Sequence, residues 1–378
     1  MNLIIGKPKS NIGLLRHQFS RTLLFPTRAL ALRTAHDVIL WCSLAWAIGG
    51  VLGPMQAAAL LQRESNPGRT PSEVQPVAPR PGNDEALLFS QVDHCIADRK
   101  LGEAEVLLQD YLHRSPDSAG ALYRLGRVFF DRHNWSASTA YLLRSLKIND
   151  QNDRAHLILG LDYFQLNRIE EAGRELLTAV KQNPQSDENQ YMAGRYFFTK
   201  SKRTEALAFF YEAVRLNAEN FKAYHSLGLC FANLGNYALA ENYYKQAIEI
   251  AEKQNIKFQQ GYLDLADLLT GIESTKVSEG EIFARRAAEL SPDSSEAHFL
   301  VGKALFREGE HIKALPELLR SINLDPKDSR PHFLLAKIYQ KLNRQADAEA
   351  EYEKFRQLMK FQTERGQTAS SRSLSPVH

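Results

Sequence analysis

Residues 153–186 read DRAHLILGLDYFQLNRIEEAGRELLTAVKQNPQS and hold the pattern that decides the fold of this chain. Apolar residues recur every three or four positions on both sides of the polar pair Asn167-Arg168, as on one face of an amphipathic helix. Gly160 precedes this pair, and Ala172 follows Gly160 after twelve residues. The stretch therefore predicts two helices joined by a short turn.

The same pattern returns along the chain. Gly126, Gly160, Gly194 and Gly228 are each 34 residues apart, and Gly302 resumes the series after a longer interval. Two helices of three to four turns with their turns need about 34 residues. We therefore expect a row of eight helix pairs, at 85–118, 119–152, 153–186, 187–220, 221–254, about 260–294, 295–328 and 329–362.

The order Leu159-Gly160, Tyr163, Ala172, Leu176, Ala179 and Pro184 resembles the tetratricopeptide repeat family. The resemblance covers residues 85–362 and implies an all-α, superhelical solenoid of about eight helix-turn-helix repeats. It also implies that the first helices of the repeats line an inner groove. A member of this family is expected to work by binding and not by catalysis.

Two units depart from the pattern. In the first unit Val92 and Cys95 stand where glycine and an aromatic residue are expected, as a terminal repeat allows. In the stretch 255–294, Gly280 stands where alanine is expected, which leaves open whether this is a full repeat. About six additional residues near 251–260 are expected to extend the preceding helix or its turn.

The N-terminal part differs in composition from the repeats. Residues 1–59 hold six Lys or Arg but one acid, Asp37, and residues 38–53 are almost entirely apolar. A basic start, a short apolar core and the small residues Ala57-x-Ala59 are typical of a secretory signal. We expect cleavage after Ala59 and export to the periplasm or the medium.

An uncleaved signal anchor is the alternative, because residues 38–61 are long enough to span a membrane if Pro54 is tolerated. The chain would then be tethered to the membrane, with its basic flank in the cytoplasm. Residues 60–83 contain five prolines and predict an extended linker, the solenoid is expected over 84–362, and the polar tail 363–378 is expected to be disordered.

Composition argues against several function classes. The chain has 378 residues with a formal charge of +3, and its repeats carry nearly balanced charges, so no nucleic-acid partner is expected. Its three cysteines and eleven histidines lack metal-binding spacing, and no nucleophile elbow, P-loop or dinucleotide motif occurs. We therefore expect no enzyme activity, no cofactor and no metal.

The family resemblance implies which residues line the inner groove of the first helices. A protein or peptide ligand is expected there, since aromatic faces bury apolar side chains while Arg pairs with carboxylates. Roughly half of the aromatic residues could instead pack between helices. The candidate groove residues are Tyr123, Arg124, Arg127, Phe130, Tyr191, Arg195, Phe198, Lys222, His225, Asn233, Lys303 and Arg307, with Phe299, Phe333 and Lys337 at equivalent places.

Several alternatives stay open at this point. The solenoid could bind nucleic acid as a helical repeat, or serve as a regulatory subunit of an enzyme complex. The sequence carries no signal for the oligomeric state or for the identity of the partner. A scaffold or adaptor in the assembly of cell-envelope or exported complexes is the function that the leader and the repeats together favour.

Overall fold

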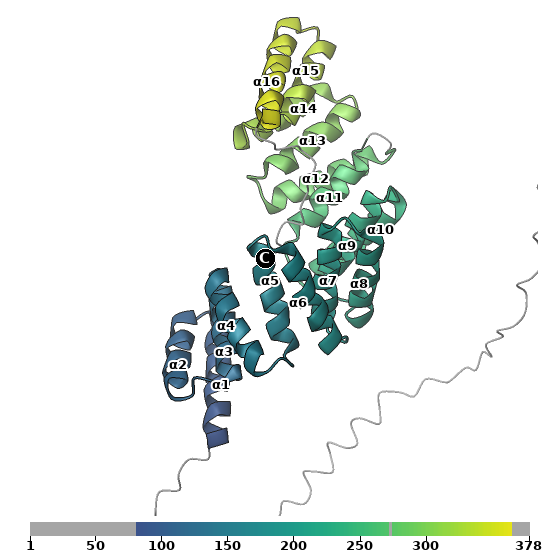
Figure 1. Ribbon diagram of the computed structural model, residues 1–378. Helices are drawn as coiled ribbons and strands as arrows, with labels where there is room; N and C mark the ends of the chain where they lie inside the picture. The colour runs from purple at the N-terminus through teal and green to yellow at the C-terminus, as the bar shows by residue number, and fades with distance from the viewer. Residues whose placement is uncertain (1–80, 272–273, 365–378) are drawn as a thin grey trace, which may run out of the picture. The chain divides into compact units, whose positions relative to one another are not determined.

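The computed structural model describes residues 81–271 and 274–364, and helices are the only regular secondary structure in these ranges. The leader 1–59, nearly all of the linker and the tail from residue 365 lie outside the described residues. Sixteen helices in the described part form eight consecutive pairs, and each pair packs against the next (Figure 1). The predicted all-α solenoid of about eight helix-turn-helix units is confirmed.

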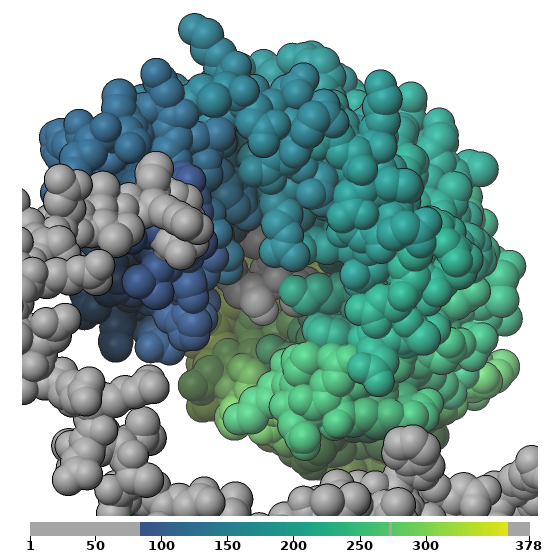
Figure 2. Space-filling view, turned by 90° about the horizontal axis from the view of Figure 1, so that it is seen from below, coloured from purple at the N-terminus to yellow at the C-terminus, as the bar shows by residue number. Residues whose placement is uncertain are grey.

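We call the first helix of each pair helix A and the second helix B. The pairs are α1 Pro81–Ala97 with α2 Leu101–Arg114, α3 Ala119–Asp131 with α4 Trp135–Ile148, α5 Asp153–Gln165 with α6 Ile169–Gln182, α7 Asp187–Thr199 with α8 Arg203–Leu216, α9 Phe221–Asn233 with α10 Tyr237–Lys253, α11 Gln259–Leu269 with α12 Val277–Leu290, α13 Ser295–Arg307 with α14 His311–Leu324, and α15 Arg330–Lys341 with α16 Gln345–Glu364. Figure 2 shows their atoms in the same chain order, from blue to green.

Side-chain caps set where several of these helices begin. Ser118, Asn152, Ser186 and Ser294 each accept a hydrogen bond from the backbone N–H three residues later, which satisfies one of the free donors of the first turn. The polar residues between the pairs are therefore N-caps. They stop one helix B and start the next helix A.

The turn inside seven of the eight described pairs holds one residue in the left-handed conformation. Asn167 and Asn343 have φ near 58°, and Ser201 has φ 59°, whereas Gly235 and Gly309 take the equivalent places with φ 76° and 84°. Asn tolerates this conformation better than most residues, and Gly adopts it without a steric cost. The short polar turns found in the sequence are thus the points where the chain reverses.

The periodic glycines make room for a large side chain of helix B. A Cβ on Gly160 would lie 2.7 Å from Leu176 Cγ and 3.3 Å from the carbonyl oxygen of Ala172. The same close approach joins Gly126 to Leu142, Gly194 to Phe210, Gly228 to Tyr244 and Gly302 to Leu318. The glycine therefore faces chiefly the large residue sixteen positions later. Ala172 approaches Gly160 only through its backbone carbonyl oxygen.

Polar contacts join neighbouring pairs at the same register. The buried Asn189 of α7 donates to Asp153 Oδ2 of α5 at 3.0 Å and to the carbonyl of Ala179 at 3.2 Å. One unit later, Asn217 and Asn220 both donate to Asp187 Oδ2 at 2.9 Å. These bonds satisfy carbonyls and carboxylates that packing takes out of water.

A histidine and a glutamate nineteen residues apart join helix A to helix B in three pairs. His156 Nδ1 lies 2.6 Å from Glu175, His298 Nδ1 lies 2.7 Å from Glu317, and His332 bonds to Glu351 in the same way. Burial alone would lower the pKa of His156, but its bonds to Glu175 and to a backbone carbonyl outweigh that effect and raise the pKa. These histidines therefore connect the two helices of a pair.

The sixth pair is complete but altered. Helix α10 has 17 residues where α8 has 14, so the additional residues lengthen this helix as well as the turn after it. A Cβ on Gly280 would lie 2.8 Å from Thr270 Cγ2 and 3.1 Å from Leu269 Cβ, so α11 and α12 approach more closely here than alanine would allow. The stretch 255–294 therefore contains a full helix pair.

Asp162 of α5 is fully buried against α4. Neither of its carboxylate oxygens has a hydrogen-bond partner among the described residues, and neither do the nearby hydroxyls of Ser138 and Thr139. Burial raises the pKa of Asp162 to about 7, although these two hydroxyls moderate the shift. Below about pH 7 the carboxyl group at this contact between pairs is therefore mostly protonated.

None of the helices described here is long and apolar enough to cross a bilayer. The apolar segment 38–61 lies outside the described residues.

We predict that Gly160→Leu strongly destabilises the solenoid, because its side chain would overlap Leu176 and overpacking costs about 1–3 kcal/mol or more. A thermal melt followed by circular dichroism measures the loss. Gly102→Leu is the matched control, since a Cβ there meets only Arg132 at 3.6 Å. Equal melting temperatures for the two variants would contradict the packing role of Gly160.

We predict that Asp162→Asn stabilises the chain at pH 8 and has little effect at pH 4. The carboxyl group of Asp162 loses its proton near pH 4 in the unfolded chain but only near pH 7 in the folded chain, so the stability of the chain falls as pH rises between these values. Denaturant unfolding at several pH values should show a gain of about 1–3 kcal/mol at pH 8. The exposed Asp117→Asn serves as the control, and a pH-independent gain would exclude this explanation.

Candidate functional site

Helices α3 and α5 bring three of the predicted groove residues into one hollow of about 170 Å³. Tyr123, Arg127 and Phe130 come from α3. Their neighbours in the lining are Arg154, Leu157, Ile158 and Leu161 of α5, together with Asp131 and Glu188. Helix periodicity explains the grouping, because residues three or four positions apart share one face of a helix. Three residues that the sequence proposed for the groove thus lie together on one wall of this hollow.

Two guanidinium groups of the hollow form no close ion pair with a described residue. Neither Arg127 nor Arg154 forms an ion pair with another residue of the described ranges, although Asp131 and Glu188 also line the hollow. Burial raises the pKa of the Tyr123 hydroxyl, while Arg127, Arg154 and Arg124 act to lower it. The hollow thus combines apolar walls with two cations that can accept a carboxylate from outside.

Arg124, in contrast, forms contacts within the fold. Its guanidinium donates to both oxygens of Asp93 on α1, at 3.1 and 2.8 Å, and stacks over the ring of Phe89 at 4.0 Å. These contacts join the first pair to the second. The expectation that Arg124 lines a binding surface is corrected, because its charge and its flat face are already engaged.

Two aromatic candidates on α7 are buried. Tyr191 is 5% exposed and Phe198 is 6% exposed, and the Arg203 guanidinium covers the Phe198 ring at 4.2 Å. Both rings pack between helices and offer little surface to a ligand. Their expected place on the groove surface is corrected on that ground.

The guanidinium of Arg195 on α7 can bind a carboxylate from outside. Its guanidinium lies 5.9 Å from the Tyr191 ring centroid and 3.9 Å from the sulfur of Met192, without an ion pair to a described carboxylate. Burial lowers the pKa of Lys222 on α9, the neighbouring Arg195 lowers it further, and Glu188 opposes both. Arg195 and Lys222 thus lie near each other on successive helices A.

His225 and Asn233 of α9 are satisfied within the fold. His225 is 5% exposed, and its Nε2 lies 2.8 Å from Asp264 Oδ2 of α11. Asn233 donates to the carbonyl of Leu229 at 2.8 Å. His225 therefore ties two pairs together, which corrects its expected role as a surface ligand residue.

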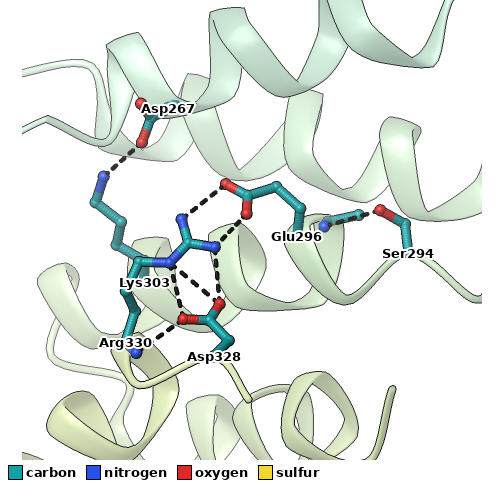
Figure 3. A network of polar contacts seen from close by, with 7 residues as sticks. Asp267, Ser294, Glu296, Lys303, Asp328 and Arg330 are labelled. Carbon is teal, nitrogen blue, oxygen red and sulfur yellow. Dashed lines mark hydrogen bonds and ion pairs between the residues drawn. The ribbon is translucent and has the colours of Figure 1, made fainter. Parts of the chain in front are cut away.

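Lys303 of α13 and Arg330 of α15 are engaged by nearby acids (Figure 3). Lys303 donates to Asp267 at 3.0 Å, and Arg330 binds the carboxylates of both Glu296 and Asp328. Arg307 donates to the carbonyls of Gly271 and Ser274 in the turn after α11. Lys303 and Arg307 thus hold neighbouring segments in place.

Sequence reasoning missed these pairings, although a signal for them was present. The second residue of helix A alternates in sign along the repeats, as Arg154, Glu188, Lys222 and later Glu296 and Arg330. Equivalent residues of adjacent repeats lie side by side, so alternation predicts attraction between pairs. Comparing equivalent positions in neighbouring units would have predicted the pair of Arg330 with Glu296. The same comparison also pairs Arg154 with Glu188, which form no ion pair within the described residues, so the rule alone is not sufficient.

The described residues contain no group of three or more His, Cys, Asp or Glu side chains that could hold a metal ion. Cys95 and Cys230 are buried as free thiols, and burial raises the pKa of Cys230 to about 12. A thiol with a raised pKa is a poor nucleophile.

Family models match most of the solenoid. Two models described as tetratricopeptide repeat match residues 221–254 and residues 123–188 and 157–221. A model described as bacterial transcriptional activator domain matches residues 264–371. None of the curated proteins matches the sequence.

Solved structures share the fold. PilF of Pseudomonas aeruginosa is 20% identical with a TM-score of 0.51, over 57% of this chain and 96% of PilF. The C-terminal part of a TPR repeat-containing protein from Cytophaga hutchinsonii is 15% identical with a TM-score of 0.50, over 62% and 95%. A chain of the APC/C hetero-tetramer Cut9-Hcn1 is 15% identical with a TM-score of 0.50, over 72% and 52%. At these identities the likeness concerns the fold alone.

Proposed function

Because the chain is a tetratricopeptide-repeat protein, we propose that it is a non-catalytic scaffold that binds an acidic segment of a partner protein across α3, α5 and α7. Repeats of this type bind peptides or proteins. The observation that supports the location is the set of cations without an ion pair, Arg127, Arg154 and Arg195, on successive helices A.

The chemistry of this surface favours an extended segment with alternating acidic and apolar residues. Tyr123, Phe130 and Ile158 supply apolar walls beside Arg127 and Arg154. Carboxylates of the segment would form charge-assisted hydrogen bonds with the guanidinium groups, while its apolar side chains cover the walls. Asp131 and Glu188 would repel a basic segment and so contribute to specificity.

The match to a bacterial transcriptional activator domain does not lead us to propose nucleic-acid binding. Lys and Arg side chains bind nucleic acid by displacing the counterions condensed on its phosphates, and a cation already held by carboxylates is less available for this. In the matched region Lys303 and Arg330 are bound to Asp267, Glu296 and Asp328. A protein or peptide partner remains the proposal.

We further propose that the scaffold acts in the cell envelope or in exported complexes. The basic start, the apolar residues 38–53 and Ala57-x-Ala59 support export, and the alternative is an anchor formed by residues 38–61. In both cases the repeats would be on the outer side of the cytoplasmic membrane.

Charge reversal tests the groove. We predict that Arg127→Glu and Arg195→Glu, made in the full chain, each weaken binding of a fluorescein-labelled peptide of alternating Asp, Leu, Glu and Phe by about tenfold or more, since bonds to charged groups contribute about 1.5–3 kcal/mol. Fluorescence anisotropy at 150 mM salt measures this. A peptide with Lys in place of the acids should not bind the parent.

The matched control is Arg174→Glu, because Arg174 is exposed on helix B of the third pair, away from the hollow. This variant makes the same change in net charge and should bind the acidic peptide at parental affinity. Equal losses in all three variants would show a nonspecific charge effect and would refute the groove.

Export gives a separate prediction. N-terminal sequencing of the full-length gene product recovered from cells should find a chain that begins at Leu60, as cleavage after Ala59 requires. A membrane-bound chain that retains the residues before Val38 would contradict cleavage and support the anchor.

A further inference from the structure

The solvent-facing side of three helices B carries apolar and basic residues that the groove does not use. We propose that this surface, the outer stripe, docks the solenoid on an anionic lipid bilayer. The outer stripe consists of Leu143 and Lys147 of α4, Leu177 and Lys181 of α6, and Tyr211 and Arg215 of α8. These are the second helices of three successive pairs (Figure 1). The inference goes beyond the scaffold function, because that function uses helices A.

In each of these helices an exposed apolar residue is followed four positions later by an exposed cation. Leu143 is 46% exposed, Leu177 37% and Tyr211 41%. Residues four positions apart share one face of a helix, so each apolar side chain has a cation beside it. The residues one position earlier, Leu142, Leu176 and Phe210, are fully buried. The core positions of these helices are therefore filled, and the exposed apolar residues are additional to them.

The pattern is confined to the second, third and fourth pairs. The equivalent residues of the other pairs are Gln109 and His113, Lys245 and Glu249, Arg285 and Glu289, Leu319 and Asn323, and Glu353 and Gln357. None of these pairs of positions joins an apolar residue to a Lys or Arg. The repeat architecture alone therefore does not require the outer stripe.

The charge left over on α4 and α6 is positive. Their cations form no ion pair with any residue of the described ranges; they are Arg144, Lys147, Arg174 and Lys181. Helix α4 has no acid, and the acids of α6 are all engaged, Glu170 by Lys200, Glu171 by Arg168 and Glu175 by His156.

The opposing charges near the outer stripe are few. Arg215 of α8 is paired with Glu212, and Glu205 is the acid of these three helices that has no cation partner among the described residues. Asp150, in the turn after α4, is also exposed and accepts a hydrogen bond from Gln151. The surface over α4 and α6 therefore attracts anions.

A bilayer surface suits this arrangement better than a second copy of the chain. Leu and Tyr side chains can enter the headgroup layer, where Tyr is favoured, while the neighbouring Lys and Arg reach the phosphates. Each cation close to an anionic leaflet adds to the attraction. Two copies that brought the same face together would place Lys147 and Lys181 against like charges. The envelope location proposed above would supply the bilayer.

The test places a reporter in the outer stripe of the full chain. Leu177→Cys is labelled with the environment-sensitive dye nitrobenzoxadiazole in a chain that also carries Cys42→Ser, since Cys95 and Cys230 are buried as free thiols. Vesicles of phosphatidylcholine with about 30% phosphatidylglycerol should shift the dye emission to shorter wavelength, whereas phosphatidylcholine alone should not. Lys147→Gln combined with Lys181→Gln should weaken vesicle binding about 25-fold, because each such cation contributes a factor of about five.

Two controls match the reporter and the charge change. The dye on Ile312→Cys reports from an exposed apolar residue of another helix B, and it should not shift even if the leader attaches the chain to the vesicle. Lys341→Gln combined with Lys360→Gln removes two exposed lysines outside the outer stripe and should leave the shift at residue 177 unchanged. Circular dichroism checks that all variants retain their helices.

Several results would overturn the inference. These are no shift at residue 177 with the anionic vesicles, equal shifts with both kinds of vesicle, an equal shift at residue 312, or parental binding when Lys147 and Lys181 are both replaced. A shift that appears without vesicles and grows with protein concentration would also overturn it, because a second copy would then cover the outer stripe.

The groove variants separate this inference from the proposed function. Arg127→Glu and Arg195→Glu should leave the dye shift unchanged, because both residues lie on helices A. If these variants weaken the acidic peptide while anionic vesicles cause no shift, the scaffold stands and the outer stripe is wrong. A shift with anionic vesicles in a chain that does not bind the peptide would support the bilayer contact and reject the groove.

Discussion

The contact between a glycine of helix A and a large side chain of helix B is the constraint on which the other features depend. With no side chain at Gly160, Gly194 or Gly228, the two helices of a pair come close enough for Leu176, Phe210 and Tyr244 to be fully or almost fully buried. Because every pair is packed in this way, successive pairs stack with the same geometry. That succession in turn places equivalent residues of neighbouring helices A beside one another.

The sequence alone was sufficient for the repeat because its period, its small residues and its turn residues recur at fixed distances. The same reasoning could not show that Tyr191 and His225 are buried, since a helix has one face toward its own helix B and another toward the next pair. Nor could it show that Arg124 pairs with Asp93, a contact between units. Periodicity identifies which residues share a face, and only packing shows which of them remain exposed.

Whether a cation on a helix A is paired depends on the residues that this stacking places beside it. In the C-terminal pairs, nearby carboxylates bind the cations Lys303 and Arg330. In the earlier pairs, Arg127 and Arg154 stand without such acids within ion-pair distance. One scaffold can therefore present two chemically different surfaces without any change in its backbone.

The principal contacts of each described pair are with its immediate neighbours, so no pair depends directly on a distant one. Stability in such an array is the sum of local terms, and opening can begin at an end and advance one pair at a time. Amide hydrogens should therefore exchange fastest in α1 and α16 and slowest in the central helices. The two ends of the array would then unfold independently of each other. The hollow between α3 and α5 would be lost with the N-terminal pairs, at a free energy that these pairs set.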